Sequence, residues 1–168
     1  MPKATVLVVE DESIVSKDIQ YSLKKLGYEV IGSSATGAKA IELALELKPN
    51  IVLMDIMLKG DINGIEASAE IKKSLNIPII FLTARNDDKS EAKGLELGAV
   101  DYITKPFGVS IVKSRVKIHL ELKHVREALE NQNAILKIKI KDLEKKISAH
   151  DFEGAAKSLT SLTENLEQ

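Results

Sequence analysis

The chain has 168 residues, of which 44% are hydrophobic, so it is long enough for one domain with its own core plus a smaller appendage. Its 24 Lys and Arg residues are balanced by 25 Asp and Glu residues, so no charge excess draws it to nucleic acid or an acidic membrane. Cysteine is absent, which excludes disulfides and thiolate metal sites. No signal peptide pattern is present and no apolar run approaches the roughly 20 residues that span a bilayer, so we expect a soluble, cytoplasmic protein.

Between residues 4 and 107, five short β-rich runs alternate with helical patterns. The runs predict strands over residues 5–9, 29–33, 51–55, 77–83 and 100–104. The first, third and fourth are almost continuously apolar, as in parallel strands covered on both faces. The helical patterns between the strands have apolar stripes at Ile14, Ile19, Leu23 and Leu26; at Ala40, Leu43, Ala44 and Leu47; at Ile65, Ala69 and 71–75; and at Ala92, Leu95 and Leu97. This alternation predicts an α/β domain, doubly wound around a five-stranded parallel sheet.

After Pro106 the chain contains no proline and continues as a long, charged helical pattern. Its apolar residues recur every three or four positions and form a heptad-like seam with one stutter. They are Ile118, Leu122, Val125, Leu129, Leu136, Ile140, Leu143 and Ile147. Asp151 is a candidate cap for a further helix, which either continues the coil or folds back. We expect residues 123–168 to form a helical extension, as a coiled coil or a helix hairpin, because the seam would otherwise face water; a solvated single helix is the alternative.

Acidic residues stand where two of the predicted strands end. Asp55 closes the apolar run IVLMD, and Glu10 and Asp11 follow the first strand. A buried carboxylate without a partner is costly, so Asp55 requires a partner or a function. In open parallel sheets, ligands bind at the carboxyl ends of the strands, where these groups meet if the strands are neighbours. Three adjacent carboxylates repel one another unless a divalent cation neutralises them, and such hard oxygen ligands suit Mg²⁺.

Three further groups are predicted at the same edge of the sheet. The fourth strand ends in FLTA, which brings the Thr83 hydroxyl and the Ala84 backbone amide there, and Lys105 follows the fifth strand. A lysine ammonium suits a phosphate oxygen. A hydroxyl, an amide, an ammonium and a metal around one carboxylate describe a site for a transferred phosphoryl group.

The segments VVEDE, IVLMDIMLKGDINGIE, FLTA and DYITKPF resemble, in order and spacing, the receiver domain of two-component response regulators, over residues 4–122. The resemblance implies a flavodoxin-like sheet with strand order 2-1-3-4-5. It also implies that Asp55 is the phosphoacceptor, that Glu10 and Asp11 are the Mg²⁺-binding acidic pair, and that Met57 is a ligand through its backbone carbonyl.

The same resemblance assigns the remaining site residues and a partner. Lys105 would contact the phosphoryl group, Thr83 would be the switch hydroxyl and Tyr102 the switch aromatic. The partner would be a histidine kinase, whose phosphohistidine is attacked by Asp55. The protein would then be a phosphoacceptor that signals through its C-terminal helices, not an enzyme acting on other molecules. The alternative is a receiver fold used for interaction or dimerisation without phosphorylation.

The C-terminal segment and the histidines complete the expectations. The residues after Leu122 lack the pattern of a helix-turn-helix and carry little net charge, so nucleic-acid binding is not expected, whereas a homodimer is. His119 and His124 are five residues apart and do not share a helical face, so we expect surface residues, not metal ligands. For His150 we expect a structural or solvent-exposed role in preference to a phosphorelay role.

Overall fold

A computed structural model of the chain describes residues 4–83, 101–105, 108–148 and 152–164. The chain divides into two compact units, Met1–Lys123 and His124–Gln168. The first unit contains a sheet and the helices that cover it, and the second is helical. No helix of the described ranges combines the length and apolar content needed to cross a membrane.

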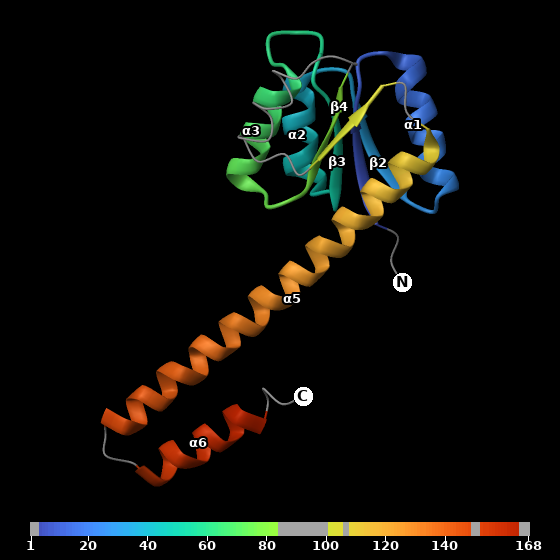
Figure 1. Ribbon diagram of the computed structural model, residues 1–168. Coiled ribbons are helices and arrows are strands. Elements are labelled where there is room, and N and C mark those ends of the chain that lie inside the picture. Colours follow the sequence, from blue (N-terminus) through green and yellow to red (C-terminus); the bar gives the residue numbers. More distant parts are fainter. Residues whose placement is uncertain (1–3, 84–100, 106–107, 149–151, 165–168) are drawn as a thin grey trace. The chain divides into compact units, whose positions relative to one another are not determined.

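The described part of the first unit contains one sheet of five parallel strands (Figure 1). They are β1 (Thr5–Val9), β2 (Glu29–Ser34), β3 (Ile51–Asp55), β4 (Ile79–Thr83) and β5 (Asp101–Thr104). The strand order is β2-β1-β3-β4-β5 and every pairing is parallel. The predicted fold class and strand order are therefore confirmed. The fourth strand begins two residues later than predicted, after Pro78, which has no N–H to donate to a neighbouring strand.

Helices cover both faces of the sheet. The helices α1 (Ser13–Lys25) and α5 (Val109–Ser148) contribute to one apolar core, and α2 (Gly37–Leu47) and α3 (Gly64–Ser74) contribute to the other. Side chains alternate between the two cores along each strand, so that Val6 and Val8 point to the first and Leu7 and Val9 to the second. Because both faces are covered, β1, β3 and β4 are buried along almost their whole length, which is why their sequences are continuously apolar.

The segment between β3 and α3 is held at both ends. At its end, Asn63 and Glu66 form a capping box: the Asn63 side chain accepts from Glu66 N at 2.9 Å, and the Glu66 side chain accepts from Asn63 N at 3.0 Å. The first residue of α3 also contacts the start of the segment, because Gly64 N donates to Ile56 O at 3.0 Å. A Cβ on Gly64 would overlap the carbonyl oxygen of Asp55. Glycine is therefore required where α3 begins, directly against the end of β3.

One expectation about a helix is wrong, and two others lie outside the described residues. Ile14 belongs to the apolar stripe predicted for the first helix, but its side chain is 76% exposed, so it does not face the core as that stripe implies. Ile14 lies in the first turn of α1, whereas Ile19 and Leu23 lie further along the helix and are buried. The stripe predicted at residues 92–97 and the cap predicted at Asp151 lie outside the described residues.

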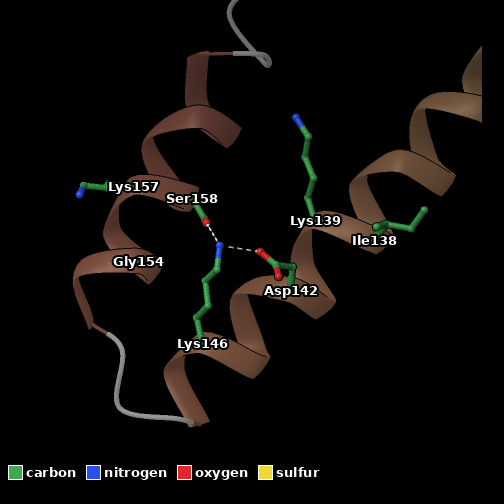
Figure 2. A pocket seen from close by; sticks show the side chains of 7 residues that line it. All are labelled: Ile138, Lys139, Asp142, Lys146, Gly154, Lys157 and Ser158. Carbon is green, nitrogen blue, oxygen red and sulfur yellow. Dashed lines mark hydrogen bonds and ion pairs between the residues drawn. The ribbon is translucent and has the colours of Figure 1, made fainter.

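In the second unit, α6 (Phe152–Glu164) lies beside the last turns of α5 (Figure 2). Lys146 Nζ donates to Ser158 Oγ of α6 at 2.8 Å and pairs with Asp142 Oδ2 of its own helix at 2.8 Å. A hollow of about 500 Å³ between the two helices is lined by Ile138, Lys139, Asp142, Lys146, Gly154, Lys157 and Ser158. Many apolar side chains of this unit remain exposed; they include Val125, Leu129, Ile135, Ile138, Ile140 and Ile147.

Candidate functional site

Three carboxylates meet at the carboxyl edge of the sheet. Glu10 and Asp11 follow β1, and Asp55 ends β3, the strand paired with β1 through Val9 and Met54. Each of the three offers an oxygen within 4.8 Å of the others. Glu10 and Asp55 are buried, with exposures of 2% and 5%. The proximity expected from the sequence is thus present, and it follows from the adjacency of β1 and β3.

Lys105 places its ammonium between two of these carboxylates. Its Nζ lies 2.8 Å from Asp55 Oδ2 and 2.7 Å from Glu10 Oε2. Its backbone is fixed to the neighbouring strand, because Lys105 N donates to Thr83 O at 2.7 Å. Burial by itself lowers the pKa of Lys105, but the hydrogen bonds and charges of Asp55 and Glu10 outweigh burial and raise the pKa above its ordinary value. Lys105 is therefore a permanent cation in this pocket.

Among the pocket residues, Glu10 is a carboxylate whose ionised form is disfavoured by its surroundings. Burial raises its pKa, and the negative charge of Asp55 adds to the increase, although Lys105 opposes both. Its Oε1 accepts from Glu12 N at 3.2 Å, and its buried Oε2 has the Lys105 ammonium, at 2.7 Å, as its charged partner. A buried carboxylate oxygen with spare lone pairs beside two further carboxylates is the donor set that a hard cation such as Mg²⁺ takes.

The loop after β3 supplies two more contacts to the pocket. Met57 N donates to Asp55 Oδ1 at 3.1 Å, which places the Met57 backbone at the phosphoacceptor candidate, while the Met57 side chain is 70% exposed. Lys59 Nζ lies 3.4 Å from Asp11 Oδ2. Lys59 is not among the site residues predicted from the sequence, where its only signal is a cation four residues after Asp55.

Thr83 and Tyr102 lie on β4 and β5, the two strands that follow β3 in the order of the sheet. Thr83 ends β4 and is buried, with an exposure of 1%. Tyr102 is half-buried on β5, and its ring packs against Phe81 with a centroid distance of 5.5 Å. Ala84, whose amide was expected at the same edge, lies outside the described residues.

A second polar cluster joins the start of β5 to α5. Asp101 Oδ2 lies 2.9 Å from Arg115 Nη1 and 3.0 Å from His119 Nε2. The side chain of His119 is 13% exposed, so its expected surface position is wrong, whereas His124 is exposed. Sequence spacing could not reveal this contact, because it depends on α5 packing beside β5.

A parallel sheet with an acidic pocket and a partly buried lysine at its carboxyl edge is the arrangement of a candidate phosphoryl-binding site. The chain belongs to the response regulator receiver domain family of two-component systems, whose model matches residues 6–117. The resemblance noted in the sequence is thereby confirmed.

Solved structures agree with this assignment. The receiver domain of a modulated diguanylate cyclase from Desulfovibrio desulfuricans is 30% identical, with a TM-score of 0.70, over 74% of this chain and 99% of that one. A putative response regulator from Chloroflexus aurantiacus is 31% identical, with a TM-score of 0.66, over 71% of this chain and 99% of that one. NtrX from Brucella abortus shares the fold, with a TM-score of 0.73 and 23% identity, over 77% of this chain and 29% of that one.

Proposed function

We propose that Asp55 accepts a phosphoryl group from the phosphohistidine of a histidine kinase in the cytoplasm, and that the chain is a signalling switch, not an enzyme acting on other molecules. The observation that carries this proposal is the position of Lys105 Nζ, 2.8 Å from Asp55 Oδ2 at the edge of an acidic pocket. A lysine held at this distance can follow the carboxylate oxygen as it becomes part of an acyl phosphate and can contact the incoming phosphoryl oxygens.

The transfer is a nucleophilic displacement at phosphorus. A carboxylate oxygen of Asp55 forms the new P–O bond while the P–N bond of the phosphohistidine breaks, and the imidazole leaves with that electron pair. Met57 N holds Oδ1 and Lys105 holds Oδ2, so the carboxylate is oriented before the donor arrives. In this proposal the Thr83 hydroxyl and the Ala84 amide contact the other phosphoryl oxygens.

We assign the metal site to Glu10, Asp11, Asp55 and the Met57 carbonyl. The spare lone pairs on buried Glu10 Oε2 and the crowding of three carboxylates support Mg²⁺ as the ion. When bound there, Mg²⁺ supplies positive charge for the phosphoryl oxygens.

The proposed output runs from the pocket to the C-terminal helices. Phosphorylation would draw Thr83 toward the phosphoryl group and let Tyr102 repack, which biases a two-state element. We propose a receiver domain at residues 4–122 and a helical extension at 123–168 that pairs with a second copy of the chain. The support for a second copy is the heptad spacing of exposed apolar residues, including Val125 and Leu129 at 66% and 55% exposure, because a repeated seam is complementary to itself.

Phosphorylation of the full chain tests the proposal. Incubation with Mg²⁺ and acetyl phosphate is expected to add one phosphoryl mass to the intact protein, and Asp55→Asn is expected to add none. Asp61→Asn is the matched control, because Asp61 is exposed in the loop that follows β3 and its substitution makes the same change in charge. EDTA should suppress the adduct. An adduct that persists in Asp55→Asn, or its absence from the wild type with any donor, would refute the assignment.

A receiver fold used only for assembly is the second candidate. Its supporting observation is the set of exposed apolar residues in the helical unit, which require a partner whether or not Asp55 is phosphorylated. This candidate predicts association that is identical for the wild type and Asp55→Asn, with and without acetyl phosphate. A change in association that depends on Asp55 would exclude it.

A further inference from the structure

We infer that Lys59 is a built-in competitor for the divalent cation: its ammonium pairs with Asp11 when no metal is bound and gives way when Mg²⁺ enters. The inference rests on the metal site assigned under the proposed function. It concerns a residue in the loop between β3 and α3 whose charge lies at the mouth of the pocket.

The charges in the pocket support this role. Lys105 Nζ contacts Glu10 and Asp55 at 2.7 and 2.8 Å, which leaves Asp11 as the carboxylate that Lys105 does not pair with in the described contacts. Lys59 Nζ, 3.4 Å from Asp11 Oδ2, supplies the cation for this third carboxylate. With both lysines in place, the metal-free pocket holds two positive charges against three negative ones, so crowded carboxylates can exist there without a metal.

The two lysines differ in how firmly they are held. The side chain of Lys105 is 25% exposed and its backbone is bonded to β4, whereas the side chain of Lys59 is 75% exposed. An exposed ammonium on a flexible stem leaves its partner at little cost, because water replaces the lost contact. Lys59 is therefore the cation that a metal displaces, and Lys105 is the one that stays.

The backbone of Lys59 is nevertheless fixed, so its reach to Asp11 is reproducible. Lys59 forms a parallel β-bridge with Thr36, the residue that caps α2. Nearby, Ile62 packs so closely on α2 that a Cβ on Gly37 would overlap the Ile62 carbonyl oxygen. Gly60, with a φ of +98°, makes the turn that follows Lys59. The loop thus holds the Lys59 stem at one place while the ammonium remains free to move.

Removing the charge of Lys59 should tighten metal binding. Mg²⁺ no longer has to displace the Lys59 ammonium from Asp11, so Lys59→Met is expected to lower the Kd for Mg²⁺ by roughly two- to fivefold, the scale of an exposed ion pair. Lys59→Glu, which adds a carboxylate at the mouth of the pocket, should lower the Kd further. Lys59→Arg keeps the charge and should stay close to the wild type.

Isothermal titration of Mg²⁺ into the unphosphorylated full chain measures these values. Lys73→Met is the matched control, because Lys73 is also an exposed lysine in an ion pair, with Glu70 at 2.6 Å, but lies in the last turn of α3, away from the start of that helix at the pocket. The difference between wild type and Lys59→Met should shrink as salt is added, since exposed charges are screened.

The outcomes separate this inference from the metal site itself. If the wild type binds Mg²⁺ and Lys59→Met binds it with the same Kd, the competitor role is refuted while the site stands. If Lys59→Met and Lys73→Met tighten binding equally, the effect is one of net charge, which also refutes the role. If none of the proteins binds Mg²⁺ at millimolar concentration, the metal site is refuted and the inference with it.

Discussion

The two units of this protein differ in how much of their apolar side chains is exposed to water. In the first unit, residues of β1, β3 and β4 such as Leu7, Leu53 and Phe81 are fully buried under helices on both faces of the sheet. In the second unit, Val125, Leu129 and others leave half or more of their surface in water. The first unit therefore satisfies its own hydrophobic residues, while the second leaves a seam that a partner can cover.

The largest expected effect is the loss of stability when a buried side chain of the first unit is truncated. Phe81→Ala removes a ring that is 0% exposed and contacts Tyr102, so it should lower the free energy of unfolding by about 3–5 kcal/mol. Leu129→Ala, on the exposed seam, should change it by no more than about 0.5 kcal/mol at concentrations where the chain is monomeric. Urea unfolding of the full chain measures both values. Equal losses in the two variants would show that the seam is already buried within one chain.

The next effect in size concerns association through the seam. Leu129→Asp places a charge where a second copy would pack, and loss of a buried leucine contact of at least about 2 kcal/mol corresponds to an increase in the dissociation constant of about 30-fold or more. Asn131→Asp adds the same charge two residues away, on the opposite side of the helix, and should leave association unchanged. Sedimentation at several protein concentrations reports the dissociation constants. A wild type that stays monomeric at tens of micromolar, which is about the range of a weak dimer, removes the second copy from the proposal.

The same contrast explains what the sequence could predict. The strands were predicted to within two residues because burial on both faces demands uninterrupted apolar runs such as IVLMD. The acidic pocket was predictable as well, because strand order alone brings Glu10, Asp11 and Asp55 to one edge. These features depend on periodicity and topology, which the order of residues along the chain carries directly.

What the sequence missed depends on contacts between distant segments. The exposure of Ile14 and the contact of His119 with Asp101 follow from how α1 and α5 lie on the sheet, not from their own periodicity. The ion pair between Lys59 and Asp11 depends on the bridge between Lys59 and Thr36, which joins two loops. A lysine in a polar loop gives no hint of its partner, because most such residues are solvated.

The smallest expected effect is the change in stability with pH that comes from the buried carboxyl group of Glu10 in the first unit. The fold raises the pKa of Glu10 through burial and the neighbouring Asp55, so the metal-free folded chain binds this proton more tightly than the unfolded chain does. The stabilisation from that proton is complete below the ordinary carboxyl pKa and is lost as the pH rises through the raised one. Lys105, whose pKa is also raised, stays charged over this range and adds nothing to the slope.

Glu10→Gln removes this ionisation and measures its cost. In EDTA, the variant should gain stability relative to the wild type as the pH rises through the carboxyl range, from about pH 3 to about pH 7, and the gain should vanish at the acidic end. Urea midpoints across this range supply the comparison, with exposed Glu46→Gln as the control. A wild type that gains stability over Glu10→Gln as the pH rises would mean that Lys105 compensates for more than burial costs, and that the metal-free pocket favours an ionised Glu10. The expected direction instead means that ionised Glu10 destabilises the metal-free fold, which is the condition under which a bound cation would stabilise it.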